Sequence, residues 1–254
     1  MNLFETVLAA LYTMPLMEAA LVSLLGNVAV FALALIAGDF LVRRFHDRAN
    51  AAPPPPLSRQ EVRLAAACVV LNTAVAIAGI ALWRADLIRP GDSSGLVAVA
   101  RDVLVLTLAM DLGMYVFHRV AHHPVLFRII HVTHHLHERP RPLTLFVLNP
   151  FEVLGFGALL IVTLALVQAS ALAIVIYLVL NLVFGLVGHL GVEPAPKAWI
   201  RLPVFRHVST STFHAGHHQD KDHNFGFYTL IWDRLFGTLS PAYQHEFGRA
   251  TGER

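Results

Sequence analysis

The sequence predicts an all-α fold: an integral membrane helical bundle of about four to five membrane segments with a cytoplasmic, histidine-rich helical cap. The first observation is composition, because 56% of the residues are hydrophobic and only 14% are charged, whereas soluble domains carry about 25% charged residues. The second is a set of long apolar stretches, which buried helices of soluble proteins seldom sustain. The third is histidine density, with fifteen in 254 residues.

Four apolar stretches define the bundle. Residues 16–42 and 64–83 can each cross a hydrocarbon layer of ~30 Å, which needs about 20 helical residues. A third stretch, 95–117, is interrupted by three charged side chains. The apolar region 151–190 breaks softly at residues 168–170 and predicts a helical hairpin of two spans or a deep re-entrant pair.

The connection between the first two spans is the clearest linker. Residues 51–60 contain four consecutive prolines, which favour an extended polyproline segment and prevent one continuous helix. The start of the chain, MNLFETVLAALYT, lacks a basic region and carries Glu5, so we expect no cleavable signal peptide.

Arginines in the short loops predict the orientation, because cytoplasmic loops carry an excess of basic residues. Residues 43–63 hold five arginines and the opposite loop, 84–101, holds three. We therefore expect residues 43–63 and the histidine-rich segments on the cytoplasmic side, and the N-terminus outside.

Charge and cysteine usage exclude several classes of function. The net charge is +2 and basic patches with interleaved aromatic residues are absent from the sequence, so a nucleic acid partner is not expected. The single cysteine, Cys68, excludes an intramolecular disulfide and a cysteine-based metal centre.

Histidines recur at the spacing of residues that share one helix face. Positions three and four apart lie on the same side of a helix, and Pro124 favours a bend between the first two groups. The three groups are His118 and His122; His131, His134 and His135; and His214, His217 and His218.

Eight such histidines exceed the four ligands of a tetrahedral zinc site and suit two neighbouring metal ions. Imidazole binds Zn, Cu, Fe and Ni, so the ligands do not name the metal. His189 is a ninth candidate, because an ionisable residue at the end of a span is a functional hypothesis by default. For His46, His207 and His245 we favour solvated or hydrogen-bonded side chains.

The sequences HRVAH, HVTHH and HAGHH resemble the three histidine boxes of the fatty acid hydroxylase and sterol desaturase superfamily. DLGMYVFHRVAH and NFGFYTLIWDRLFGT are similar to two further stretches of that family, so the resemblance covers roughly residues 98–240. It implies a catalytic domain at 93–240, preceded by membrane helices at 1–92 and followed by a C-terminal tail at 241–254.

The resemblance also implies that nine histidines hold a two-metal centre. His123, His137 and His223 lie next to the boxes and are left open as ligands, proton relays or solvated side chains. Asn149 stands where many relatives have a histidine. The implied ligands are His118, His122, His131, His134, His135, His189, His214, His217 and His218.

Supporting groups follow from the tendency of metal-bound imidazoles to donate their other N–H to a carboxylate or carbonyl. The acids near the boxes are Asp111, Glu152, Glu193, Asp222 and Asp233. We single out Asp111, Tyr115 and Glu152, with a chain from Asp111 through Tyr115 on the face that carries the first histidine group. A packing contact with a neighbouring helix is the alternative role for Asp111. For Trp232, Asp233 and Arg234 we expect structural roles: an Asp–Arg pair and an aromatic anchor at the membrane surface.

The resemblance implies a membrane-bound dimetal oxygenase, with iron as the expected metal, that hydroxylates or desaturates a lipid C–H bond using O₂. The sequence lacks a dinucleotide fingerprint and cysteines for an iron–sulfur cluster, so the electrons must come from an external ferredoxin- or cytochrome-type reductase system. The sequence leaves open which lipid reacts and which of the two reactions occurs.

Two other functions compete with the oxygenase. A zinc-dependent membrane hydrolase or isomerase would use the same ligands without oxygen. A divalent-metal transporter is less favoured, because transporters place their sites near mid-membrane between repeats, and this chain shows no internal repeat.

Overall fold

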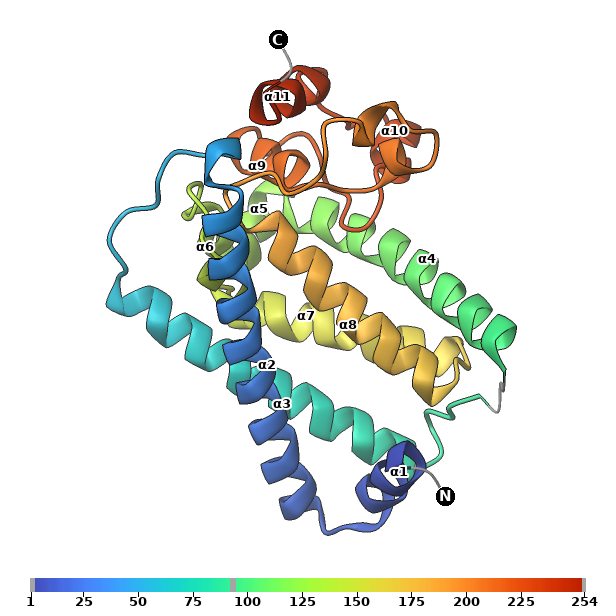
Figure 1. Ribbon diagram of the computed structural model, residues 1–254. Helices are drawn as coiled ribbons and strands as arrows, with labels where there is room; N and C mark the ends of the chain where they lie inside the picture. Colours follow the sequence, from blue (N-terminus) through green and yellow to red (C-terminus); the bar gives the residue numbers. More distant parts are fainter. Residues whose placement is uncertain (1–2, 92–94, 253–254) are drawn as a thin grey trace.

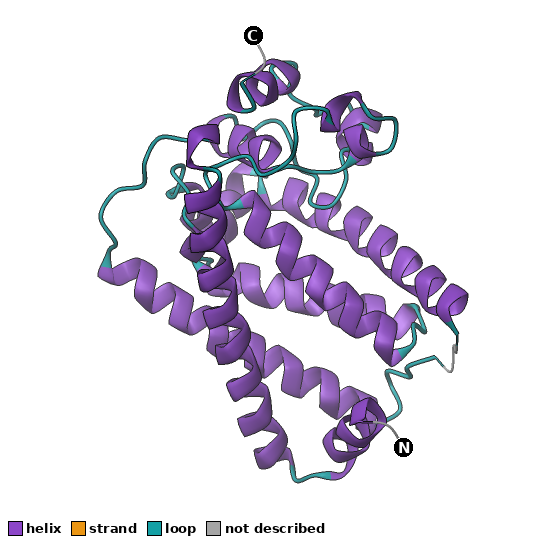
Figure 2. Ribbon diagram, in the orientation of Figure 1, coloured by secondary structure: helices purple, strands orange, loops and turns teal. Residues whose placement is uncertain are grey.

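The computed structural model describes residues 3–91 and 95–252. Within those residues the chain consists of helices and loops, with a few isolated β-bridges and no strand (Figure 2). The predicted all-α class is therefore confirmed.

Six helices form the bundle, and most of them run lengthwise past one another (Figure 1). The predicted break in the apolar region 151–190 is the turn between the last two. The six helices are α1 (Leu3–Thr13), α2 (Leu16–Arg44), α3 (Arg59–Arg84), α4 (Leu96–Ala121), α7 (Pro150–Leu166) and α8 (Ala171–Gly188).

Short helices form a cap at the end of the bundle where α2, α4 and α8 finish (Figure 1). This places the loop after α2 and the histidine-rich segments at the same end of the molecule. The cap helices are α5 (Pro124–Leu126), α6 (Val132–His135), α9 (Ser211–Gln219), α10 (Ile231–Leu235) and α11 (Tyr243–Ala250).

Three of the described helices, α2, α3 and α8, are long and apolar enough to cross a membrane, and α7 is a shorter apolar helix of 17 residues. In α4 the charged side chains noted in the sequence interrupt an otherwise apolar helix. Membrane association is supported by these helices, and the count of four to five segments stays a prediction.

The start of α3 follows from local chemistry at the end of the proline run. The Ser58 hydroxyl accepts a hydrogen bond from the Glu61 amide at 3.1 Å, and the Glu61 carboxylate accepts one from the Ser58 amide at 2.8 Å. This capping box satisfies amides that have no partner inside the helix. The predicted linker therefore ends inside its range, because residues 59 and 60 already belong to α3.

Small residues let the bundle helices approach closely. A Cβ atom added to Gly157 of α7 would lie 2.4 Å from Val75 of α3, and one added to Gly155 would lie 2.5 Å from the Phe117 ring of α4. Such contacts are typical of helix packing in membranes, where dispersion rather than water exclusion drives association.

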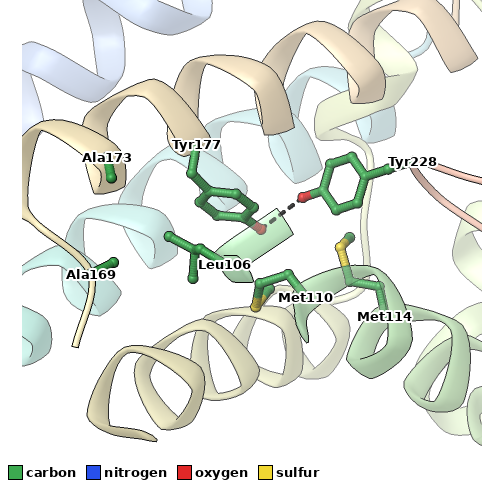
Figure 3. Packing of buried hydrophobic residues seen from close by; sticks show 7 residues of the cluster. All are labelled: Leu106, Met110, Met114, Ala169, Ala173, Tyr177 and Tyr228. Carbon is green, nitrogen blue, oxygen red and sulfur yellow. Dashed lines mark hydrogen bonds between the residues drawn. The ribbon is translucent and has the colours of Figure 1, made fainter. Parts of the chain in front are cut away.

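A buried cluster joins α4, α8 and the cap (Figure 3). Inside it the Tyr177 hydroxyl lies 2.7 Å from the Tyr228 hydroxyl, which donates to the Asn181 side-chain oxygen at 2.6 Å. Buried hydroxyls need such partners. Because Tyr228 belongs to the cap, this network fastens the cap to the bundle.

Residues 241–254, which we predicted to be a C-terminal tail, contain α11. Its Tyr243 and Phe247 are buried against Phe213 of α9 and Leu230, so α11 packs within the cap, and the division of the chain at residue 241 stays a prediction. The predicted boundary between residues 92 and 93 lies outside the described residues.

Candidate metal centre

The fold gathers the nine predicted histidines into two neighbouring groups. In each group the nearest ring nitrogens all lie within 4.8 Å of one another. The first, which we call the five-histidine group, is His118, His122, His131, His135 and His217; the second, the four-histidine group, is His134, His189, His214 and His218.

Three parts of the chain bring these side chains together. The first histidine pair lies at the C-terminal end of α4, and Pro124 begins α5 directly after it. A π-helical turn, Phe127–His131, then leads into α6. Helix α9 carries the third group, and His189 caps the C-terminal end of α8.

The boxes divide between the groups by helical position. His131 and His135, four residues apart, point into the five-histidine group, whereas His134 between them belongs to the other. In α9 the division is reversed, because His214 and His218 join the four-histidine group and His217 joins the five. Each three-histidine box therefore serves both groups.

The ring nitrogens in each group converge at ligand-like distances. In the five-histidine group, Nε2 of His118 and Nε2 of His131 are 3.0 Å apart, and Nε2 of His135 is 3.0 Å from that of His217. Metal–nitrogen bonds of about 2.1 Å would separate neighbouring ligands by roughly 3.0 Å at right angles and 3.4 Å in a tetrahedron. The observed spacings fit this range.

The four-histidine group shows the same convergence. His214 Nε2 lies 3.3 Å from His189 Nε2 and 3.1 Å from His218 Nε2. The His134 and His218 rings have a centroid distance of 4.5 Å and are tilted by 47° to each other. All four rings thus face one small volume.

Hydrogen bonds fix which ring nitrogen is free. Nδ1 of His118 donates to the Phe225 carbonyl at 2.9 Å, that of His217 donates to the His223 carbonyl at 2.7 Å, and that of His189 donates to the Gly185 carbonyl at 2.7 Å. A carbonyl oxygen only accepts. When these three rings are neutral, Nε2 therefore carries the unprotonated lone pair, and this lone pair points into the histidine group.

Convergent lone pairs without a positive charge between them repel one another, so the arrangement favours a bound cation. His131 adds to the case, because its Nδ1 lies 2.7 Å from the Glu152 carboxylate while its Nε2 faces that of His118. Neutral imidazoles whose other nitrogen is held by a carbonyl or carboxylate are typical metal ligands. The residues present therefore fit a pair of metal ions.

Burial keeps these imidazoles neutral. It lowers the pKa of His135 to about 3 and holds the pKa values of His134, His217 and His218 well below the usual range, with nearby histidines adding to the shift. Neutral rings are the form that binds metal.

A pH dependence of stability follows from these pKa shifts. In the unfolded chain the histidines take up protons below about pH 6.5, while the folded, metal-free protein does not bind them, so the folded state loses stability as the pH falls. Each buried imidazole contributes at most about 1.4 kcal/mol per pH unit. Thermal melting of chelated protein in detergent should show a melting temperature that is highest above pH 6.5 and falls towards pH 4. A melting temperature that is flat or rises on acidification would contradict it.

The three predicted supporting residues lie in different places. Glu152 contacts His131 directly, as expected of a supporting carboxylate. Asp111 accepts hydrogen bonds from the Tyr228 and Thr229 amides and from the Trp232 indole. Asp111 therefore anchors the cap. These hydrogen bonds lead from Asp111 to the cap and not to Tyr115, so they do not make the predicted chain. The Tyr115 hydroxyl instead contacts the Thr238 hydroxyl and accepts from Arg119.

Asp233 and Arg234, the predicted Asp–Arg pair, also make other contacts instead. Asp233 accepts from the Phe225 and Gly226 amides at 2.8 and 2.7 Å, and Arg234 donates to the Arg206 carbonyl. Asp233 thus holds the turn whose Phe225 carbonyl orients His118. The Trp232 indole points at Asp111 and acts as an anchor to α4.

Asn149, which the resemblance places at a position expected to carry a histidine, has a structural role. Its side-chain oxygen accepts from the Phe151 amide at 2.9 Å and caps α7, while its amide donates to the Ile129 carbonyl at 3.0 Å. The cap positions the first turn of α7, which carries Glu152.

The remaining histidines lie outside both groups. His123 and His245 are exposed, while His137 donates to the Thr133 carbonyl. The His223 ring contacts the Asp220 carboxylate, and its backbone carbonyl holds His217. The last two are His207, which accepts from Arg206, and His46, which contacts the Arg43 carbonyl.

Sequence reasoning missed the backbone carbonyls that orient the rings. It did identify Glu193 as an acid near the boxes, and the Glu193 carboxylate accepts from the Ala195 and Thr212 backbone amides. Every residue has a backbone carbonyl, so the residue type does not reveal which carbonyl orients a ring. Asn224 offers one indirect signal, since it adopts φ +63° immediately before Phe225 and marks a specific turn.

Comparison with known proteins agrees with this geometry. The sequence profile of the fatty acid hydroxylase family matches residues 103–238, which is more than half of the chain and contains every histidine of the two groups. The chain belongs to the fatty acid hydroxylase family. The superfamily resemblance of the histidine boxes is thereby confirmed.

Individual relatives in the family differ in named activity. The chain is 34% identical over 155 residues to a very-long-chain aldehyde decarbonylase of Oryza sativa subsp. indica, covering 58% of this chain and 24% of the relative. It is 26% identical over 160 residues to cholesterol 25-hydroxylase of Rattus norvegicus, covering 63% and 53%. A Delta(7)-sterol 5(6)-desaturase of Leptosphaeria maculans is 29% identical over 139 residues, covering 55% and 37%.

The chain thus spans between about a quarter and a half of the length of these curated relatives. No solved structure matches it.

Proposed function

We propose that this fatty acid hydroxylase family member is a membrane-bound oxidoreductase that hydroxylates or desaturates a lipid C–H bond at a two-metal histidine centre. The observation that carries the proposal is the set of Nε2 atoms that face one another at 3.0 to 3.3 Å in both histidine groups. Family membership supports oxidative lipid chemistry, since relatives are named as hydroxylases and desaturases.

The five-histidine group would hold one metal ion and the four-histidine group the other. Iron in both sites would supply the activation of O₂ and the removal of hydrogen from an unactivated C–H bond. Imidazole donors accept both iron and zinc, so iron is proposed from the family's chemistry rather than from the ligands.

The protein's own contribution is to orient the rings and to exclude water. The Phe225, His223 and Gly185 carbonyls fix three imidazoles, and Glu152 fixes a fourth. The Phe225 ring lies 5.1 to 5.5 Å from three rings of the five-histidine group. This aromatic cover makes the surroundings apolar and keeps the ligands neutral.

A lipid substrate is proposed from the setting of the site. The histidines lie at the ends of apolar bundle helices, so an acyl or sterol substrate could enter sideways from the membrane and present one carbon to the metals. Relatives that act on cholesterol and other sterols support this class.

The electron supply is proposed to be an external ferredoxin- or cytochrome-type reductase system. We further propose that the cap faces the cytoplasm and that the N-terminus lies outside. Five arginines in residues 43–63, at the end of the bundle that carries the cap, support this orientation.

Metal analysis with an oxygen test decides between the proposed function and its zinc alternative. We expect purified protein to contain about two iron ions per chain and to oxidise a lipid only when O₂ and an electron donor are both present. Lipid profiles of cells with and without the protein would identify the substrate. Turnover of a lipid under strictly anaerobic conditions would refute the oxygenase and favour a zinc-dependent hydrolase or isomerase, and metal flux into proteoliposomes would favour a transporter.

A further inference from the structure

We propose that Glu193, together with the segment Arg48–Asn50 after α2, is a positioning clamp that sets the four-histidine group. The inference rests on the proposed metal centre. Glu193 is one of the acids near the histidine boxes in the sequence. The other half of the clamp, Arg48–Asn50, precedes the residues matched by the family profile.

The carboxylate of Glu193 ties together two segments that carry ligands. One oxygen accepts from the Ala195 amide at 2.9 Å, and the other accepts from the Thr212 amide at 2.8 Å. Thr212 is in the first turn of α9, two residues before His214, whereas Glu193 follows His189 by four residues. A single side chain therefore fixes the approach of His189 to His214.

The environment makes this link strong. Glu193 is 0% exposed, and Thr212 is 3% exposed. A carboxylate that accepts from amides in the first turn of a helix gains both charge-assisted hydrogen bonds and a favourable interaction with the helix dipole. Both of its oxygens are used, so a neutral amide at this position could not reproduce the bonds.

The segment after α2 closes the clamp from the other side. The Glu193 amide donates to the Arg48 carbonyl at 2.8 Å, and the Asn50 amide donates to the Gly191 carbonyl at 3.1 Å. The Asn50 side chain donates to the Ser211 hydroxyl at 3.0 Å. The end of α2 is thus joined to both the segment behind His189 and the start of α9.

The two metal sites should depend on the clamp unequally. Three of the four histidines in the four-histidine group lie on the clamped segments, namely His189, His214 and His218. In the five-histidine group only His217 lies on α9, and the His223 carbonyl holds it independently. Loss of the clamp should therefore weaken the four-histidine site first.

Glu193→Gln tests the clamp with two readouts. First, metal titration of purified protein should show one site, which we assign to the four-histidine group, with a dissociation constant raised by about 10- to 100-fold. This is the range typical for loss of a group that supports ligands. The other metal should be retained, at one per chain. Second, hydrogen exchange of metal-free protein should be faster in the peptide at the start of α9. Glu193→Asp, which keeps two acceptor oxygens on a shorter side chain, should recover part of both effects.

Asp102→Asn is the matched control, since Asp102 is a buried carboxylate that accepts from the Ser170 amide at 3.0 Å at the start of α8, far from the histidines. It should leave the metal stoichiometry unchanged. Asn50→Ala should act in the same direction as Glu193→Gln, but less strongly.

Equal loss of both metals in Glu193→Gln, or a profile identical to that of Asp102→Asn, would overturn the clamp. Unaltered exchange in α9 would do the same. If the wild-type protein bound no metal, the proposed function would be refuted, and the exchange measurement alone would decide whether Glu193 fixes α9.

Discussion

Replacing His217 by alanine should abolish activity and remove metal from the five-histidine group. His217 is fully buried, its Nδ1 is held by the His223 carbonyl, and its Nε2 lies 3.0 Å from that of His135. The variant loses one of five converging donors and opens a cavity beside the others. The effect should exceed the about 10- to 100-fold loss that follows removal of a group that only supports a ligand.

His134→Ala removes a ligand from the other group and separates two versions of the proposal. If both metals act together, each variant should be inactive although each keeps one group intact. If a single metal carried the reaction, one of the two variants would remain active. Iron content per chain and O₂-dependent lipid oxidation measure both effects.

His245→Ala is the control, because His245 is exposed on α11 and belongs to neither group. It should keep wild-type metal content and activity. Full metal content together with full activity in His217→Ala would show that the converging rings are not ligands.

The helices of the bundle could be predicted because apolarity and length suffice to define them. The predicted stretches 16–42, 64–83 and 95–117 correspond to α2, α3 and α4. The ends of α3 could not be placed as closely, since its start depends on the Ser58 capping box rather than on hydropathy. Helix α1 was not predicted, because its short apolar run precedes the first long one.

The nine histidines could be predicted from the sequence as one set, but their division into two groups could not. Spacing of three and four residues indicates a shared face, but about 100° separates consecutive residues on a helix. His131 and His135 are therefore about 40° apart, while His134 lies about 100° from His135 and points into the four-histidine group. Which rings meet which depends on how α6 and α9 face each other, and that is tertiary structure.

Supporting contacts were the least predictable part of the site. Glu152 was identified as a candidate because a carboxylate commonly holds a ligand histidine, and it contacts His131. The acid on the same helix face as the first histidines, Asp111, was expected to act similarly. Its carboxylate instead meets amides from a segment more than 110 residues later in the chain, and no local pattern carries that information.

Asp111→Ala should cause a large loss of stability. Asp111 is 0% exposed and accepts from the Tyr228 amide at 3.0 Å, the Thr229 amide at 3.2 Å, the Thr229 hydroxyl at 2.5 Å and the Trp232 indole at 3.0 Å. Each buried donor left without an acceptor costs about 1–3 kcal/mol. The total is a large part of the about 5–15 kcal/mol that stabilises a typical fold.

Thermal melting in detergent measures this loss, and Asp39→Ala is the matched control. Asp39 is an exposed carboxylate on α2 that pairs with Arg43 at 2.8 Å, and exposed pairs contribute about 0–1 kcal/mol. The control should melt close to the wild-type protein, while Asp111→Ala should melt far lower or fail to accumulate.

The milder Asp111→Asn variant connects this anchor to the metals. The segment that Asp111 holds begins three residues after Phe225, whose carbonyl orients His118. A folded Asp111→Asn protein should therefore bind metal more weakly in the five-histidine group than in the four-histidine group, which is the reverse of the order expected for Glu193→Gln. Metal titration of the two variants side by side shows which histidine group loses metal affinity first in each. If the same group weakened first in both variants, the cap would respond to either change as a single unit.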